Sequence, residues 1–217
     1  MNNPLFDSMK QSILDGDPDA AVELARQALA QQLDPLEAIN QGYLPGMSQV
    51  GRQFGAGELF LPDVILAAEA MKKATAILEP EMKAHGTQRQ ATGKVVIGTV
   101  KGDVHEIGKS LVATLLSANG FEVYDLGVDV PFERFAAKAD EVGADIVGVS
   151  ALLTTTMTGQ KQVIAALDNA GLRPRVKVMV GGAPVTRAWA QEIGADGYSE
   201  DALGAVELAK KLVEAGQ

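Results

Sequence analysis

The sequence predicts an α/β protein in which a helical bundle precedes a doubly wound parallel sheet. Up to Ala84 the apolar residues recur at helical spacing, with almost no strand-like alternation. After Gly93, short β-branched runs alternate with longer amphipathic segments, a pattern typical of a parallel sheet covered by helices on both faces. Residues 85–93 have no apolar period and are interpreted as a linker. We therefore expect a helical domain over residues 1–88 and a sheet domain over residues 89–217.

The first domain is predicted to be a bundle of four short antiparallel helices. Apolar stripes and turn signals place these helices at residues 5–14, 18–29, 36–55 and 62–79. Asp17 is expected to cap the second helix, with Pro18 in its first turn. We expect a break in the third helix at Pro45-Gly46 and the end of the fourth before Pro80, because proline lacks the backbone N–H that a helix interior needs.

The second domain is predicted to contain five strand–helix units. The expected strands cover residues 94–100, 121–126, 145–150, 176–180 and 197–198. The expected helices cover residues 107–118, 131–142, 158–169, 188–193 and 201–213. In open parallel sheets, ligands bind beside the carboxyl ends of the strands. The loops that follow the strands are therefore the places to look for a functional site.

Composition excludes several classes of function. The chain has no cysteine and only two histidines, which excludes disulfides, thiolate catalysis and a multi-histidine metal cage. Its net charge is −9, and neither half has an excess of basic residues, so we expect no nucleic-acid partner. No apolar run reaches the ~18 residues that a membrane span needs. The start of the chain lacks the pattern of a signal peptide, so we expect a soluble cytoplasmic protein.

The loop after the first strand contains the only histidine of the second domain. It reads Gly102-Asp103-Val104-His105-Glu106-Ile107-Gly108. In an extended loop, residues two apart point the same way, so Asp103 could hydrogen-bond one ring nitrogen of His105 and leave the other facing outward. Such a carboxylate fixes the tautomer of an imidazole and raises its basicity. The alternative is that Asp103 caps the following helix and that His105 is an ordinary exposed residue.

Two further loops carry unusual residues. Hydroxyl groups gather after the third strand, in the segment from Ser150 to Thr156, and they could either form a polar wall for a ligand or cap the next helix. Gly181-Gly182 follows the fourth strand, where paired glycines permit close approach by a flat group. The sequence contains no nucleophile elbow, no P-loop and no dinucleotide-binding fingerprint, and a single local histidine makes zinc improbable.

Taken together, these residues resemble the cobalamin-binding domain of the methionine synthase type. The matching motifs are Asp103-x-His105-x-x-Gly108, Ser150-x-Leu152 and Gly181-Gly182, in that order. Upstream, Met47–Phe54 and Gly57–Pro62 resemble the helical cap that precedes this domain. The resemblance covers most of the chain and implies a flavodoxin-like or Rossmann-like sheet. The whole chain is similar to the small corrinoid proteins of methyltransferase systems, which serve dimethylamine, trimethylamine, methanol, methoxyaromatics (O-demethylases) or betaines.

The resemblance implies a role for each residue of the first motif. His105 would be the lower axial ligand to cobalt, replacing the cofactor's own dimethylbenzimidazole, so that cobalamin binds base-off and His-on. Asp103 would hydrogen-bond His105, and Thr156 would extend this relay. These three residues are the expected catalytic group, and His105 is the expected metal ligand.

The resemblance also implies a set of cofactor-binding residues. They are Gly102, Asp103, Val104, His105, Glu106, Ile107, Gly108, Ser150, Leu152, Thr154, Gly181, Gly182, Ala183, Tyr198, Ser199, Phe54 and Leu61. Ser150 and Thr154 would bond the nucleotide tail of the cofactor, and the paired glycines would clear its path. Tyr198 and Ser199 would close the pocket.

Phe54 and Leu61 have two possible interpretations. By the resemblance they would cover the upper face of the corrin ring. By their spacing alone they are equally well explained as core residues of the helical bundle.

The function that the resemblance implies is methyl carriage. Cobalamin, as methylcobalamin in the loaded state, would accept a methyl group from a substrate-specific methyltransferase and pass it to a second, acceptor methyltransferase. A reductive activation protein would be a further partner, and the chain would not be catalytic without these enzymes. One alternative is a cobalamin-dependent sensor, but we expect no DNA-binding module here. A second alternative is a receiver-like signalling domain, which needs an acidic cluster that the first strand lacks.

Overall fold

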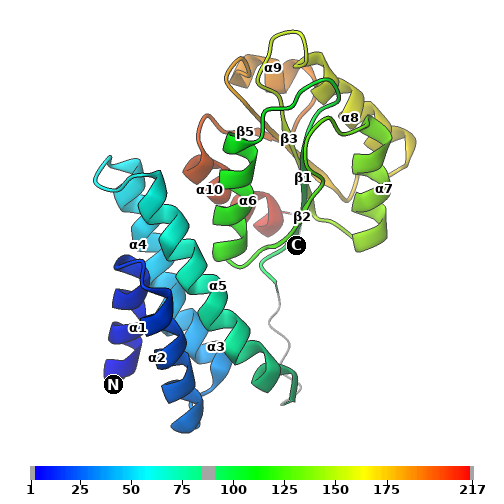
Figure 1. The fold of residues 1–217 in the computed structure, drawn as a ribbon. Helices are drawn as coiled ribbons and strands as arrows, with labels where there is room; N and C mark the ends of the chain where they lie inside the picture. Colours follow the sequence, from blue (N-terminus) through cyan, green and yellow to red (C-terminus); the bar gives the residue numbers. More distant parts are fainter. Residues whose placement is uncertain (1–2, 85–90, 216–217) are drawn as a thin grey trace. The chain divides into compact units, whose positions relative to one another are not determined.

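The computed structural model describes residues 3–84 and 91–215. The chain divides into two compact units, residues 1–90 and 91–217 (Figure 1). Most of the expected linker, residues 85–90, lies outside the described residues. The predicted fold class, a helical bundle followed by a parallel five-stranded sheet, is confirmed.

Within residues 3–84 the first unit consists of helices and the turns that join them. Its elements are α1 (Pro4–Leu14), α2 (Pro18–Ala30), α3 (Pro35–Glu37), the π-helical segment η1 (Ala38–Tyr43), α4 (Leu44–Gly55) and α5 (Leu61–Ala84). The first three helices begin in the same way, with an Asn or Asp cap followed by proline. Asn3, Asp17 and Asp34 each accept a hydrogen bond from a backbone N–H of the first turn. This pairing satisfies otherwise free donors and uses proline where no N–H is required.

The predicted break at Pro45-Gly46 is wrong. The chain stays helical from α3 through η1 into α4, and Pro45 lies in the first turn of α4. The N–H that proline lacks falls at the junction of η1 and α4, where the regular bonding of an α-helix interior is already interrupted. The irregularity lies one turn earlier, in η1, where a wider helical turn leads into α4.

The predicted end before Pro80 is also wrong, because α5 continues through Pro80 to Ala84. The apolar face of α5 extends past the proline. Leu78 and Met82 are both buried in the bundle. Their burial offsets the hydrogen bond that Pro80 removes, which a reading of the local sequence could not foresee.

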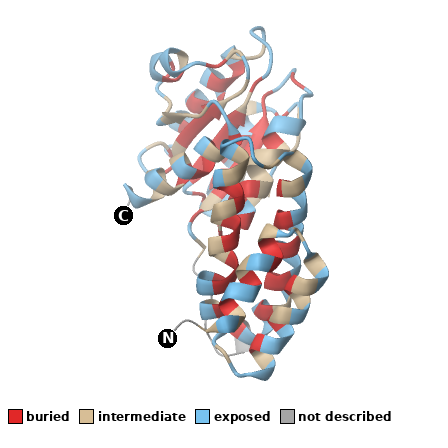
Figure 2. Cartoon of the chain, turned by 90° about the vertical axis from the view of Figure 1, so that its left-hand side faces the viewer, coloured by how far each residue is buried: buried red, intermediate tan, exposed pale blue. Residues whose placement is uncertain are grey.

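Two contacts fix how the helices of the bundle pack. A Cβ atom at Gly46 would lie 2.8 Å from the carbonyl oxygen of Lys10, so only glycine lets α4 approach α1 this closely. The hydroxyl of the buried Tyr43 donates to the carbonyl oxygen of Ala21 at 2.7 Å and joins η1 to α2. Figure 2 shows the buried residues on the faces where the helices meet.

The second unit is a parallel sheet with helices on both faces (Figure 1). Its strands are β1 (Lys94–Thr99), β2 (Glu122–Asp125), β3 (Ile146–Ser150), β4 (Lys177–Gly181) and β5 (Gly197–Tyr198). Its helices are α6 (Ile107–Ala118), α7 (Phe132–Val142), α8 (Thr158–Asn169), α9 (Arg187–Glu192) and α10 (Ala202–Glu214). Within residues 91–215 the strand order is β2-β1-β3-β4-β5, and every pair is parallel.

This strand order creates a switch point between β1 and β3. Helices α6 and α10 pack together on one face of the sheet, and α7 and α8 pack together on the other. The chain leaves β1 toward α6 and leaves β3 toward α8, so the loops after these neighbouring strands lead to opposite faces. Such a point, at the carboxyl ends of the strands, is where open α/β sheets bind their ligands.

Candidate cofactor-binding site

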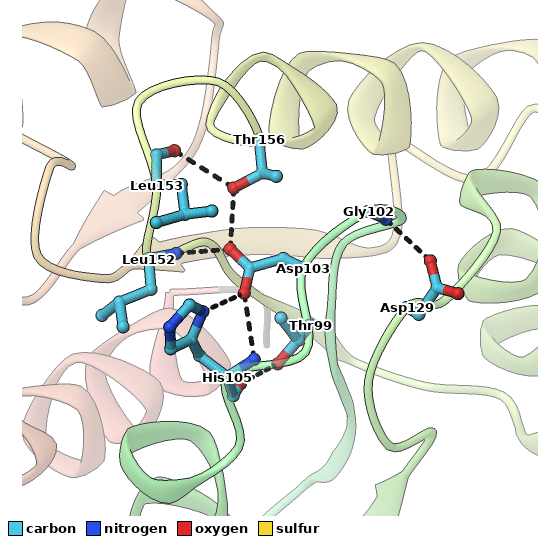
Figure 3. A network of polar contacts seen from close by, with 8 residues as sticks. All are labelled: Thr99, Gly102, Asp103, His105, Asp129, Leu152, Leu153 and Thr156. Carbon is cyan, nitrogen blue, oxygen red and sulfur yellow. Dashed lines mark hydrogen bonds and ion pairs between the residues drawn. The ribbon is translucent and has the colours of Figure 1, made fainter.

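The loops that follow β1 and β3 meet at one carboxylate (Figure 3). Oδ1 of Asp103 accepts hydrogen bonds from Nδ1 of His105 at 2.7 Å and from its backbone N–H at 3.0 Å. Oδ2 accepts from the Thr156 hydroxyl at 2.7 Å and from the Leu152 backbone N–H at 2.8 Å. The structure thus brings His105, Asp103 and Thr156 together at the switch point of the sheet.

Asp103 is held as a carboxylate. Its side chain has no exposed surface. Burial alone would raise the pKa of Asp103, but the hydrogen bonds from Thr156, Leu152 and His105 together outweigh burial and hold the pKa well below its usual range. An ionised Asp103 can only accept hydrogen bonds, so it places the proton of a neutral His105 ring on Nδ1. The other ring nitrogen, Nε2, is then unprotonated.

His105 is positioned for contact with a ligand. Its side chain is 45% exposed, although its ring is anchored to the buried Asp103. Its carbonyl oxygen accepts a hydrogen bond from the Thr99 hydroxyl at 2.9 Å, so the backbone of this residue is also fixed. No hydrogen bond to Nε2 occurs among the residues that the structure describes. An oriented imidazole with an unprotonated, accessible nitrogen is suited to binding a metal.

The surroundings of His105 fit a metal carried by a macrocycle. No cluster of three or more His, Cys, Asp or Glu side chains is found within the described ranges, so these residues offer no cage for a free ion. Large apolar side chains on these two loops and at the start of α6 are nevertheless exposed: Val104 at 71%, Ile107 at 79%, Leu152 at 39% and Leu153 at 43%. A single imidazole among exposed apolar side chains suits a flat ring that supplies the other metal ligands itself.

The other residues of the motif do not crowd the start of α6. Gly102 adopts a φ of 84°, which turns the loop. Glu106 is exposed and directly precedes α6. A Cβ atom at Gly108 would meet nothing within 4 Å, so the first turn of α6 is open to a bulky ligand.

The expected tail-binding residues lie on the loops after β3 and β4. Ser150 ends β3 at partial burial, and Thr154 and Ala183 are exposed. The fold itself also requires glycine at the second position of the Gly181-Gly182 pair. A Cβ atom at Gly182 would lie 1.8 Å from the carbonyl oxygen of Ala151, so glycine lets the loops after β3 and β4 pass each other.

Tyr198 and Ser199 are engaged within the fold. Tyr198, in β5, packs against the apolar core that α7 and α8 cover. The Ser199 hydroxyl donates to the carbonyl oxygen of Asp201 at 2.7 Å, next to the start of α10.

In the first unit, Phe54 and Leu61 are both partly buried. Neither is among the fully buried side chains of the bundle core, and both flank the turn between α4 and α5. In the same region Phe60, Ile65 and Leu66 are exposed, with Phe60 at 69%. The sequence analysis did not select these three, because their exposure depends on how α5 packs.

Two buried polar residues near the site were also missed. Gln160, in α8, donates to the carbonyl oxygens of Val149 and Gly181 and accepts from the Trp189 ring nitrogen, so it holds the ends of β3 and β4 together. Lys109, in the first turn of α6, forms an ion pair with Asp125 at the end of β2. Both lie in predicted amphipathic helices, where a charged or amide side chain is ordinarily exposed, so the local sequence did not single them out.

The fold and the site together define a parallel-sheet protein with one oriented, accessible imidazole at its switch point. Comparison with known families shows which cofactor such a chain binds. Two family models, both described as B12 binding domain, match residues 93–207 and 5–79. The chain belongs to the family of corrinoid proteins with B12-binding domains, and its cofactor is cobalamin, as the sequence resemblance predicted.

Similar proteins span nearly the same length. Dimethylamine corrinoid protein 2 of Methanosarcina acetivorans is 54% identical over 89% of this chain and 88% of its own. A corrinoid protein of Desulfitobacterium hafniense is 50% identical over 96% of this chain and 97% of its own. Among solved structures, the methanol:cobalamin methyltransferase complex of Methanosarcina barkeri matches with a TM-score of 0.88 and 32% identity, covering 100% of this chain and 82% of that one.

None of the helices in the described part of the chain is both long and apolar enough to cross a membrane.

Proposed function

We propose that this chain is a methyl carrier that binds cobalamin in the base-off, His-on form through His105. A methylated substrate would be demethylated by a partner methyltransferase, and a second methyltransferase would take the methyl group from the carrier. Bound cobalamin supplies the cobalt chemistry of methyl acceptance and release. The observation that carries the proposal is the 2.7 Å contact between Nδ1 of His105 and the buried Asp103.

Asp103 prepares His105 to bind the metal. As a buried carboxylate it keeps the imidazole proton on Nδ1, so that Nε2 can donate its electron pair to cobalt. Thr156 and the Leu152 backbone N–H complete the hydrogen bonds of Asp103 and hold its carboxylate in one orientation.

The rest of the predicted site would anchor and shield the cofactor. Ser150 and Thr154 would bond polar atoms of the nucleotide tail. The loop at Gly181-Gly182, with Ala183, would border the tail, and Tyr198 and Ser199 would close its pocket. The exposed side chains next to His105 would pack against the lower face of the corrin ring.

Phe54 and Leu61 of the first unit would cover the upper face of the ring. Their partial burial within the helical unit leaves part of each side chain available for this contact. A carrier has to expose the reactive face of its cofactor to partner enzymes, so this cover would have to be reversible.

Reconstitution with cobalamin tests the axial ligand. We expect His105→Ala to bind cobalamin more weakly and to show the visible spectrum of a base-off corrinoid without a histidine ligand. His85→Ala, which removes the chain's other imidazole, serves as the control and should keep the wild-type spectrum. Identical spectra for wild type and His105→Ala would refute ligation by His105.

A separate assay tests methyl carriage. The loaded protein should transfer a methyl group from a methylated substrate when a methyltransferase specific for that substrate is added, and should show no transfer without that enzyme. A reductive activation protein should restore carriers that have lost activity by oxidation. A loaded protein that binds cobalamin but supports no transfer with any such partner would favour the sensor alternative.

A further inference from the structure

Asp129 holds the backbone of the site from the side opposite Thr156. It lies in the β2–α7 loop, and its Oδ1 accepts a hydrogen bond from the Gly102 backbone N–H at 2.7 Å. Its own backbone N–H donates to the carbonyl oxygen of Asp103 at 2.9 Å. Figure 3 shows Asp129 and Thr156 on different sides of the loop that carries Asp103. Three loops therefore meet at Asp103, and Asp129 is the contribution of the third.

The backbone of Asp129 is itself unusual. Its φ is 53°, and among the described residues only one other non-glycine residue, Gln32, has a positive φ. Aspartate tolerates this left-handed conformation better than most residues, because its short side chain can bond nearby backbone groups. Here the side chain bonds Gly102, which is itself left-handed with a φ of 84°.

The backbone next to Asp129 is fixed because Val130 pairs with the end of β1 and the residue that follows it. The backbone N–H of Val130 donates to the carbonyl oxygen of Thr99 at 3.0 Å, and Val100 and Val130 form a parallel bridge. The β2–α7 loop thus remains paired with the chain just beyond β1. By contrast, Gly102 has no side chain to restrict its conformation and depends on outside contacts.

We propose that Asp129 is a positioning residue that aims the Asp103 carboxylate at His105, Leu152 and Thr156. The direction of a buried side chain follows from the backbone around it. Asp129 binds this backbone at two places, the N–H of Gly102 before Asp103 and the carbonyl oxygen of Asp103 itself. Removing its carboxylate frees Gly102 and lets Asp103 leave its donors. The effect on the cofactor acts through His105 and so rests on the proposed function.

Amide hydrogen exchange of the cobalamin-free protein tests the positioning directly. Asp129→Gly removes the carboxylate and keeps the left-handed backbone available. The amides of His105 and Leu152 both donate to Asp103 and are not touched by this change. We expect them to exchange about tenfold faster in Asp129→Gly, measured relative to Val147 in β3 as an internal reference. Unchanged exchange of these two amides would overturn the proposal.

Two further variants make the result specific. Asp129→Asn keeps an acceptor oxygen and tolerates the left-handed backbone, so it should restore the wild-type exchange rates. Asp145→Ala is the matched control, because the exposed Asp145 also accepts one backbone N–H at 2.7 Å, from Lys94, but at the amino edge of the sheet. It should leave the His105 and Leu152 amides unchanged. Faster exchange in Asp145→Ala, or no rescue by Asp129→Asn, would contradict a role specific to Asp129.

The visible spectrum of the loaded protein tests the consequence. Asp129→Gly should lower the fraction of cobalamin in the His-on form, whereas Asp145→Ala should not. Failure of the proposed function can be recognised separately, because it would show as identical spectra for wild type and His105→Ala. In that case the exchange rates of the cobalamin-free variants still decide whether Asp129 positions Asp103.

Discussion

The imidazole of His105 and the hydroxyl of Thr156 lie on opposite oxygens of one buried carboxylate, each 2.7 Å from Asp103. The two residues belong to different loops, which lead to helices on opposite faces of the sheet. Asp103 therefore links the proposed metal ligand to the β3–α8 loop. The first two predictions concern this link.

Replacing the carboxylate should disturb both loops. Asp103→Asn has the same shape, but its side chain has one acceptor oxygen and one amide group that only donates. Each carboxylate oxygen of Asp103 accepts from two donors, so in the variant two of these four donors would face the amide NH₂ group, which cannot accept. We expect a loss of about 2–4 kcal/mol in the free energy of unfolding and a smaller His-on fraction. Trp189, the only tryptophan, reports unfolding of the second unit by its fluorescence. A variant as stable as wild type would show that the Asp103 carboxylate does not stabilise the second unit.

The hydroxyl of Thr156 should matter more than its methyl group. Thr156→Val keeps the shape and removes the donor, so it should lower the free energy of unfolding by about 1–2 kcal/mol. Thr156→Ser keeps the donor and should lie within about 0.5 kcal/mol of wild type. Urea unfolding of the three proteins compares them directly. Equal losses in both variants would mean that packing, and not the hydrogen bond to Asp103, accounts for the effect.

Gly182 and Gly108 should respond differently to alanine. A Cβ atom at Gly182 would overlap the Ala151 carbonyl and would force a φ of 123° on a non-glycine residue. We expect Gly182→Ala to cost more than about 3 kcal/mol. Gly108→Ala adds a methyl group in open space, so it should leave the cobalamin-free protein as stable as wild type and weaken cobalamin binding. Urea unfolding and cobalamin titration of both variants measure this contrast, and unaltered affinity in Gly108→Ala would argue against a ligand at this turn.

Tyr43 should make the helical unit sensitive to alkaline pH. Burial raises the pKa of Tyr43 above its usual value of about 10, so the folded chain keeps the proton that the unfolded chain loses. The stabilising contribution is complete below about pH 10 and is lost as pH rises further. Tyr43→Phe lacks the titrating group and the bond to Ala21, so it should be less stable at pH 8, with a gap that closes toward pH 11. Circular dichroism during urea unfolding follows the gap, and a constant gap would contradict this account.

Much of the second unit could be predicted from local signals. The helices Ile107–Ala118 and Thr158–Asn169 have the predicted bounds, because apolar periodicity and the turn residues after them agree. In the first unit the predictions at Pro45 and Pro80 were wrong, and tertiary burial decides whether the helix continues past Pro80. Local sequence shows that a proline removes a hydrogen bond, but not how much apolar surface lies beyond it.

In the candidate site, too, the sequence predicts contacts within one loop but not contacts between distant loops. The pairing of Asp103 with His105 was predictable because residues two apart in a loop point the same way. The motifs also led to Thr156, but only by resemblance. The contacts of Asp129 with Gly102 and of Gly182 with Ala151 join loops that are distant in the sequence. They depend on the strand order, which no single loop encodes.

The crossing of the loops at Gly182 also limits how this sheet can diversify. Because the Ala151 carbonyl occupies the place of a side chain at Gly182, a larger residue at Gly182 requires a compensating shift of the backbone at Ala151. The exposed stretch from Leu152 to Thr155 has no such restriction on its side chains. Natural variation that tunes corrinoid preference should therefore accumulate in that stretch, while the residues at the crossing change only together.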